Sequence, residues 1–203
     1  MKFDGEFVTS AFKLGECPHW SRVEVAIAGR SNVGKSSILN ALCARIDLAR
    51  TSKTPGRTRS LNFFAVGDRF ALVDLPGYGY AKMPRAEARA ITRLMNDFLA
   101  RRENLAALVL LIDSRRGPEA EEIALARIIE QRNIELVVVA TKTDKLRNSE
   151  RRTAISRVQM LAAQPIMCSA ENGAGIEDLR RRILARVKGA ARQNTTLRGC
   201  ASP

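Results

Sequence analysis

The fold of this chain is decided by the stretch GRSNVGKS, which comprises Gly29, Arg30, Ser31, Asn32, Val33, Gly34, Lys35 and Ser36. It is a complete G-x-x-x-x-G-K-S phosphate-binding loop, a pattern that works only between a strand and a helix. The apolar residues before it predict a strand over 23–28, and the apolar spacing after it predicts a helix over 35–46. The loop therefore lies in the setting that its chemistry requires.

Each part of this loop has a reason in phosphate chemistry. Glycines let the backbone wrap closely around phosphate oxygens, and consecutive N–H groups at the start of a helix supply positive potential. Lys35 can place an ammonium against the β- and γ-phosphates, and the hydroxyl of Ser36 can ligate Mg²⁺. We predict that the chain binds a nucleoside triphosphate with Mg²⁺, and that both side chains face the ligand rather than the core.

Length and composition are those of a single globular domain. The chain has 203 residues, of which 45% are hydrophobic and 27% charged. No apolar run approaches the roughly 18 residues that span a bilayer, and the N-terminus lacks the basic and apolar regions of a secretory signal. Four scattered cysteines and one histidine have no metal-binding spacing. We expect a monomeric cytoplasmic protein with reduced thiols and no membrane span.

A net charge of +13 indicates a polyanionic partner, although a solvated arginine-rich surface is the alternative. Aromatic residues make up only 5%, so phosphate contacts to folded RNA fit better than stacking on single-stranded bases. Basic residues gather in the loop after the first predicted helix and on the expected solvent face of the last one. The first group is Arg50, Lys53, Arg57 and Arg59, and the second includes Arg180, Arg181 and Arg182.

Alternating strand and helix patterns predict a three-layer α/β/α fold with a mainly parallel sheet of roughly six strands. Unbroken apolar runs at 107–112 and 136–140 are typical of parallel strands covered on both faces. Two runs, at 61–66 and 69–73, predict a hairpin. We predict three regions, which are an N-terminal extension at 1–21, a nucleotide-binding domain at 22–188 and a flexible tail at 189–203.

A second phosphate-site motif follows the hairpin and consists of Asp74, Leu75, Pro76 and Gly77. An aspartate at a strand end can hold the Mg²⁺ shell through water, and the N–H of Gly77 can reach a γ-phosphate. D-x-x-G alone is common by chance, and a plain Pro-Gly turn is the alternative. Its place at the end of a predicted strand favours the phosphate site.

The base site is predicted where a later strand ends, at Thr141, Lys142, Thr143 and Asp144. A carboxylate there can accept two hydrogen bonds from guanine, which adenine cannot offer in that arrangement. The stem of Lys142 can cover the face of the base. The pocket would be completed by backbone N–H groups after the last strand, from Cys168, Ser169 and Ala170. Because ligands of such sheets bind at the carboxyl ends of strands, the motifs together predict binding of GTP and GDP.

These motifs resemble those of the EngB (YihA/YsxC) ribosome-biogenesis GTPases, within the superfamily that includes Era, EngA and TrmE. The resemblance is carried by GRSNVGKSS at 29–37, KTPGRTR at 53–59, LNFF at 61–64, DLPGYGY at 74–80 and TKTD at 141–144. It implies that the hydroxyl of Thr58 joins that of Ser36 on Mg²⁺, and that residues 47–60 and 78–89 are two nucleotide-sensing switches. It also implies that the end of the first switch contacts the nucleotide through Gly56, Arg57, Thr58, Arg59 and Ser60.

The resemblance also bears on the rate of GTP hydrolysis. Many GTPases have a water-orienting glutamine at the position of Tyr78, so slow hydrolysis is expected of the isolated protein. In the superfamily, an asparagine at the position of Asn32 can help to hold K⁺, and a backbone-capping loop residue is the alternative. Arg57 and Arg59 could stabilise charge in cis, although contact with RNA or solvent is favoured. We assign no catalytic base.

The family implies a nucleotide-switched assembly factor for the large ribosomal subunit, needed for normal growth and cell division. A GTP-dependent switch that acts on a protein partner in division, without binding RNA, is the alternative. The positive charge favours the first of these. A P-loop ATPase or kinase conflicts with the guanine-pairing carboxylate of Asp144.

Overall fold

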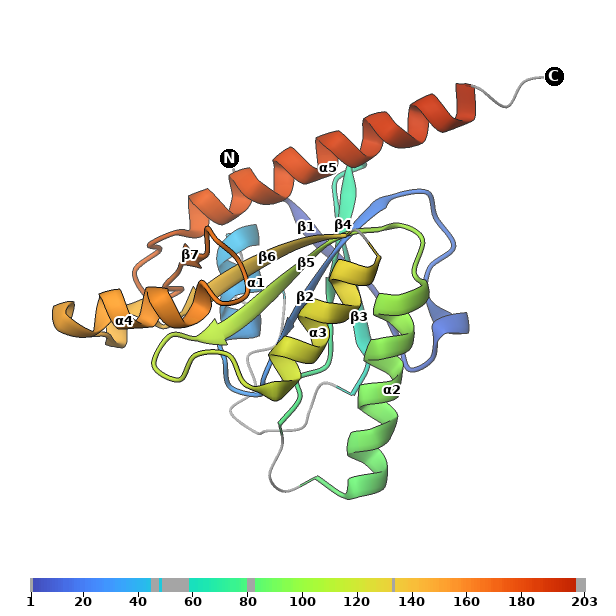
Figure 1. Ribbon diagram of the computed structural model, residues 1–203. Helices are drawn as coiled ribbons and strands as arrows, with labels where there is room; N and C mark the ends of the chain where they lie inside the picture. The colour runs from blue at the N-terminus through green and yellow to red at the C-terminus, as the bar shows by residue number, and fades with distance from the viewer. Residues whose placement is uncertain (1, 45–47, 49–58, 80–82, 133, 200–203) are drawn as a thin grey trace.

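The protein is described here from a computed structural model, which covers residues 2–44, 48, 59–79, 83–132 and 134–199, with side chains as far as residue 191. A seven-stranded sheet lies between two layers of helices (Figure 1). Its strands are β1 (Gly5–Ala11), β2 (Val23–Gly29), β3 (Leu61–Val66), β4 (Phe70–Asp74), β5 (Leu105–Asp113), β6 (Glu135–Thr141) and β7 (Ile166–Met167). The order across the sheet is β1-β3-β4-β2-β5-β6-β7. The β1–β3 and β3–β4 pairs are antiparallel, and the other pairs are parallel.

Five α-helices cover the two faces of this sheet. They are α1 (Lys35–Cys43), α2 (Arg85–Arg101), α3 (Ala120–Gln131), α4 (Asn148–Val158) and α5 (Ile176–Gly199), with short 3-10 turns η1 (Leu14–Glu16) and η2 (Thr143–Lys145). Helices α1 and α5 pack on one face, and α2, α3 and α4 pack on the other. The α/β/α layering, the parallel centre and the β3–β4 hairpin confirm the predicted fold class.

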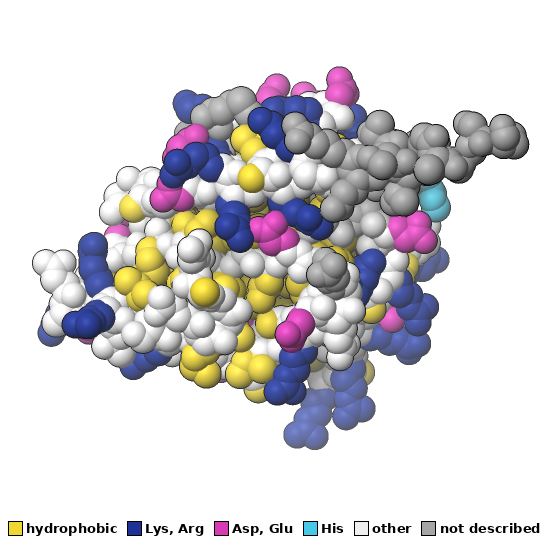
Figure 2. Space-filling view, turned by 45° about the horizontal axis from the view of Figure 1, so that its top comes forward, with side chains coloured by type: hydrophobic (Ala, Val, Ile, Leu, Met, Phe, Trp, Pro, Cys, Tyr) yellow, Lys and Arg dark blue, Asp and Glu magenta, His cyan; other side chains and the backbone are white. Residues whose placement is uncertain are grey.

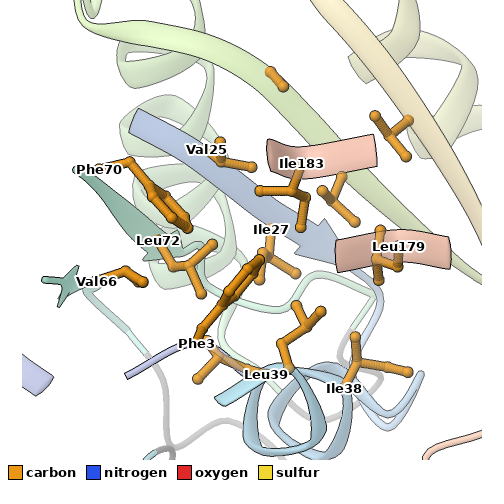
Figure 3. Close-up of a cluster of buried hydrophobic side chains, with 14 of the residues drawn as sticks. Phe3, Val25, Ile27, Ile38, Leu39, Val66, Phe70, Leu72, Leu179 and Ile183 are labelled. Carbon is orange, nitrogen blue, oxygen red and sulfur yellow. The ribbon is translucent and has the colours of Figure 1, made fainter. Parts of the chain in front are cut away.

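The core on the first face contains side chains from both ends of the chain (Figure 3). Ile27 of β2 packs there with Leu39 of α1 and Ile183 of α5. Phe3 closes the same cluster, with its ring edge-on to that of Phe70 at a centroid distance of 5.2 Å. Burial of each such side chain stabilises the fold by about 1.5–3 kcal/mol, so this layer fixes β2 and the loop that follows it.

The N-terminal segment contributes a strand where the sequence predicted only an extension. Strand β1 pairs antiparallel with β3 at the edge of the sheet, and this makes seven strands instead of roughly six. The strand has no clear alternation because the register shifts between Phe7 and Thr9, which inserts Val8 as an extra residue. Phe7 and Val8 are 56% and 45% exposed, so the strand lacks the inward-facing apolar pattern that would have revealed it.

Helix α5 continues to Gly199, well past the expected helix end near Lys188. Ala190 still lies in the core, which explains why the helix does not stop where the predicted tail begins. The last four residues lie outside the described part of the chain. Within the described ranges, no helix is both long and apolar enough to cross a membrane.

Candidate functional site

The predicted site motifs meet along one edge of the sheet. The phosphate loop follows β2, Asp74 ends β4, Thr141 ends β6, and Cys168 follows β7. These four strands run parallel to one another, so their carboxyl ends lie at the same edge. The structure therefore brings together the motifs at residues 29–36, 74–77, 141–144 and 168–170, as expected of a ligand site in such a sheet.

The phosphate loop has the glycines and the asparagine that its backbone requires. Gly34 has a φ of 100° and Asn32 a φ of 61°, a left-handed conformation that glycine and asparagine adopt most readily. Gly29 is needed for space instead, because a Cβ there would lie 2.7 Å from Cγ1 of Val33 and 3.0 Å from the carbonyl oxygen of Leu111. The loop is thus held against β5 by a close backbone approach.

Lys35 and Asp74, predicted for two different motifs, form a buried ion pair. The Lys35 Nζ lies 2.6 Å from Oδ1 of Asp74, and the side chains are 8% and 3% exposed. Lys35 is therefore more buried than the sequence predicted, because its stem is packed and its ammonium is held by a carboxylate at the edge where the phosphates would lie. Ser36, the next residue, is only partly buried.

Lys142 links the base motif to the phosphate loop and to β5. It has a φ of 58°, and its Nζ donates to the carbonyl oxygen of Asn32 at 2.5 Å and to Oδ2 of Asp113 at 3.0 Å. The guanidinium of Arg115 also donates to both Asp113 oxygens. Burial alone would raise the pKa of Asp113, but the hydrogen bonds from Arg115 and Lys142 outweigh it and hold that pKa well below the ordinary 3.8.

Asp113 is a site residue that the sequence reasoning missed. It ends β5, just as Asp74 ends β4, and that position after a long apolar run was the signal that could have found it. Thr141 also has a supporting part, because its hydroxyl donates to the carbonyl oxygen of Val33 at 2.7 Å. The base motif and the phosphate loop are therefore one connected unit.

Asp144 borders the cavity where a base would lie. The Ser169 hydroxyl donates to Oδ1 of Asp144 at 2.6 Å, and this hydrogen bond holds the pKa of Asp144 below its ordinary value, so the group is a carboxylate at neutral pH. The cavity measures about 570 Å³ and is lined by Val33, Gly34, Lys142 and Ala170, among others. Lining residues that the sequence did not single out are Ser37, Asn40, Ala41, Ala44, Lys145 and Glu171.

The segment after Asp74 is packed more deeply than the sequence suggested. Leu75 is fully buried and its N–H donates to the carbonyl oxygen of Ile27 at 3.0 Å, so Leu75 is a core residue. Pro76 and Gly77 are also buried. The hydroxyl of Tyr78 donates to Glu122 of α3 at 2.9 Å, and burial, followed by the Glu122 charge, raises the pKa of Tyr78 far above its ordinary value. The Tyr78 side chain is thus a packed anchor on α3.

Several predicted residues make other contacts or cannot be placed. Gly56, Arg57 and Thr58, with the earlier basic residues of the same loop, lie outside the described residues. Arg59 forms an ion pair with Glu87 of α2 at 2.7 Å, and the buried hydroxyl of Ser60 donates to Asn62 at 3.1 Å. The Arg30 guanidinium is directed at α3, where Glu119 lies 2.8 Å away.

The basic run on the last helix is not uniformly exposed. The Arg180 side chain is 11% exposed, and its guanidinium donates to the carbonyl oxygens of Ala41 and Leu42 at the end of α1. Its expected place on the solvent face is therefore wrong. Arg181 is 73% exposed, and Arg182 pairs with Glu135 at 2.6 Å. Basic and acidic side chains are mixed on the face that carries α5 (Figure 2).

Known proteins identify the family to which this arrangement belongs. A family model described as "50S ribosome-binding GTPase" matches residues 24–142, which contain the phosphate loop and the start of the base motif. A probable GTP-binding protein EngB of Pelotomaculum thermopropionicum is 44% identical over 181 residues, covering 87% of this chain and 91% of the relative. This chain belongs to the EngB family. It is a GTP-binding protein that hydrolyses GTP.

Solved structures share the EngB fold. The crystal structure of a probable GTP-binding protein engB matches with a TM-score of 0.67 at 24% identity, covering 82% of this chain and all of that one. Era, in complex with MgGDPNP and a 16S ribosomal RNA segment, matches with a TM-score of 0.63 at 22% identity, over 83% of this chain and 57% of Era. At these sequence identities, the structural matches show only that the chains share a fold.

Proposed function

We propose that this EngB GTPase is a nucleotide-switched assembly factor that docks on the large ribosomal subunit or its precursor in the cytoplasm, and that growth and cell division depend on it. The observation that carries the proposal is the match to a family described as 50S ribosome-binding. A net charge of +13 and the RNA complex of the structurally similar Era support it. Ribosomal RNA offers the dense phosphate charge that such a protein would neutralise.

Exposed basic side chains flank the nucleotide edge of the sheet. Helices α2 and α4 both follow site motifs, and a helix that follows a parallel strand starts at the edge where that strand ends. Five arginines at or near the starts of these helices lie exposed and have no ion-pair partner among the described residues. They are Arg85 and Arg89 on α2, and Arg147, Arg151 and Arg152 on α4. Docking at this edge would place RNA beside the segments that sense the γ-phosphate.

Nucleotide binding would use the residues gathered at the same edge. The backbone N–H groups of the phosphate loop and the Lys35 ammonium would bind the phosphates, and the N–H of Gly77 would meet the γ-phosphate. The carboxylate of Asp144 would accept the two guanine donors, with the stem of Lys142 over the base. Because Ser169 and Lys145 already donate to Asp144, its carboxylate is oriented before a base arrives.

The residues present fit a hard cation such as Mg²⁺. The Ser36 hydroxyl and the Asp74 carboxylate offer hard oxygen ligands beside the phosphate loop, and Thr58 would add a second hydroxyl. Among the described residues, no three His, Cys, Asp or Glu side chains form a metal cluster. When bound, Mg²⁺ would neutralise charge on the β- and γ-phosphates.

A potassium ion held with the help of Asn32 would add fixed positive charge near the same phosphates. Asn32 is exposed and has the left-handed backbone that asparagine tolerates. We expect faster turnover in K⁺ than in Na⁺, and we expect Asn32→Gly, which keeps that backbone without strain, to remove the difference. Equal rates in both salts for the wild type would refute the use of K⁺ and leave GTP hydrolysis unaffected.

Pelleting with purified large subunits tests the proposed docking. Binding should be stronger with a GTP analogue than with GDP and should fall steeply with salt, because phosphate contacts release counterions. The variant Arg85→Gln/Arg89→Gln should bind about tenfold more weakly at moderate salt. Its control is Arg93→Gln/Arg101→Gln, which removes equal charge further along α2. Equal losses in both variants would mean that net charge alone, without this edge, accounts for binding.

A GTP-dependent switch on a protein partner is the second candidate, and one observation favours it. Three of the four large apolar side chains exposed among the described residues lie at the edge strand β1 or just after it, namely Phe7, Val8 and Phe12. Exposed apolar side chains on a strand edge are typical of protein contacts. Absence of any ribosomal binding in the pelleting experiment would favour this candidate.

A further inference from the structure

Two sets of contacts fix the backbone just after Gly77, and the first is made by the Tyr78 side chain. Its hydroxyl donates to Oε1 of Glu122 at 2.9 Å, and both side chains are buried, Glu122 to 1% exposure. The other oxygen, Oε2 of Glu122, accepts the backbone N–H of Glu119 at 2.9 Å, which caps the start of α3. The phenol is therefore bound to a group that cannot move without disrupting the first turn of a helix.

The second set of contacts comes from the phosphate loop. The N–H of Ser31 donates to the carbonyl oxygen of Tyr78 at 2.8 Å, and Arg30 and Tyr78 form an isolated parallel bridge. This contact joins the phosphate loop directly to the segment that carries the γ-phosphate donor. Gly77 therefore has a fixed residue on each side along the chain. Asp74 before it pairs with Lys35, and the carbonyl group of Tyr78 after it is bound by the phosphate loop.

Arg30 connects these two sets of contacts, because it reaches both α3 and the Gly79 backbone. Its Nη1 lies 2.8 Å from Oε2 of Glu119 and 3.1 Å from Oε2 of Glu121, both at the start of α3. The same guanidinium lies against the backbone of Gly79, where an added Cβ would come within 2.9 Å of Nη2. Gly79 also has a φ of 75°, so a side chain there would be strained as well as crowded.

We propose that Tyr78, Arg30 and Glu122 are positioning residues that hold the Gly77–Gly79 backbone against the phosphate loop and thereby raise the affinity for GTP relative to that for GDP. The proposal rests on the proposed role of the Gly77 N–H toward the γ-phosphate. A ligand that needs a preformed arrangement loses apparent affinity in proportion to the population of that arrangement. GTP needs Gly77 close to the loop, and GDP has no γ-phosphate to contact it. Releasing the backbone therefore weakens GTP binding and spares GDP.

The experiment measures dissociation constants for GDP and for a non-hydrolysable GTP analogue, with the thermal midpoint of each nucleotide-free variant. Tyr78→Phe removes only the hydroxyl and should weaken binding of the analogue but not of GDP. The ratio of the GDP dissociation constant to that of the analogue should therefore fall by about tenfold. Arg30→Gln and Gly79→Ala act on the second side of the segment and should lower the ratio as well. The control is Arg22→Gln, which removes an arginine that pairs with Asp68, remote from the site, and should leave the ratio unchanged.

A purely structural role would lower the thermal midpoint and weaken both nucleotides equally, and that result would overturn the proposal. An unchanged or increased ratio in folded Tyr78→Phe would do the same. Should that variant fail to fold, Arg30→Gln decides, because its side chain is partly exposed and its loss leaves no buried carboxylate without a donor. Gly77→Ala separates the two proposals. If Gly77→Ala leaves the ratio unchanged, the Gly77 N–H does not contact the γ-phosphate, and both proposals are wrong. If Gly77→Ala lowers the ratio but Tyr78→Phe does not, the role of Gly77 stands and only the positioning role of Tyr78, Arg30 and Glu122 is refuted.

Discussion

The ammonium of Lys35 lies 2.6 Å from the carboxylate of Asp74, and both side chains are almost completely buried. The two residues come from different phosphate-site motifs, at the start of α1 and the end of β4. Two opposite charges at this depth need each other, because removing one leaves the other desolvated without a partner. The phosphate loop is thus joined to the segment that follows β4 through a charge pair as well as through the backbone.

Lys35→Ala should therefore affect stability as well as nucleotide binding. It leaves the buried Asp74 carboxylate without its partner, and we expect the free energy of unfolding to fall by about 3 kcal/mol. Urea unfolding of the nucleotide-free protein measures this. Ser36→Ala is the matched control, because it should weaken binding of GTP with Mg²⁺ and leave the urea midpoint nearly unchanged. Equal stability of the two variants would mean that the ion pair contributes little.

Asp144→Asn should exchange base specificity. The amide no longer accepts two hydrogen bonds from guanine, so GTP affinity should fall by about a hundredfold or more, whereas xanthosine triphosphate should gain affinity because its edge offers an acceptor. Competition between the two nucleotides measures the exchange. Glu171→Gln removes another carboxylate from the cavity lining and should change neither. Equal affinity of the wild type for ATP and GTP would contradict the base assignment.

Stability should depend on pH through Asp113. Its pKa in the folded protein is depressed below 3.8, with burial outweighed by hydrogen bonds from Arg115 and Lys142, so the folded state prefers the carboxylate. The resulting stabilisation is present above about pH 4 and is lost as the pH falls toward the folded pKa. Urea unfolding at pH 5 and pH 3 should show a smaller loss on acidification in Asp113→Asn than in the wild type. Asp68→Asn, at a fully exposed carboxylate, should behave like the wild type.

The arginines at 180 and 181 should separate fold stability from partner binding. Arg180→Ala removes donors from the carbonyl oxygens at the end of α1 and should lower the free energy of unfolding by about 1–2 kcal/mol. Arg181→Ala should leave stability unchanged and weaken ribosomal pelleting modestly, in a salt-dependent way. Urea unfolding and pelleting are measured on both variants. A loss of pelleting confined to Arg180→Ala would contradict this division.

The α/β/α layering, the parallel centre and the meeting of the motifs could be predicted because they follow from simple periodicities. Unbroken apolar runs identified β5 and β6, and a motif at the end of each parallel strand must lie at one edge. Strand β1 was not predictable in the same way, because its bulge removes the alternation and its edge position leaves Phe7 exposed. A single sequence reveals elements whose buried side chains recur at a regular spacing. An edge strand such as β1 has no such periodic pattern.

Side-chain partners of the site were harder to predict than its location. The resemblance placed Tyr78 at the position of the water-orienting glutamine of many GTPases, but whether its hydroxyl meets Glu122 depends on how α3 packs, more than forty residues later. The same holds for Asp113, whose distant partner Lys142 is brought to it only through the pairing of β5 with β6. Motifs specify which backbone binds a ligand, and tertiary packing decides what orients it.

Because Phe3 and Ile183 share one core, the larger hydrophobic layer joins the two ends of the chain. During synthesis, β1 can pair only after β3 has emerged, and the face of β2 that α1 covers in part is completed only when α5 has been made. Such late closure of distant contacts is slow, and it leaves apolar surface exposed until it is complete. A nascent EngB chain therefore completes the hydrophobic layer beneath its phosphate loop only after α5 has been made.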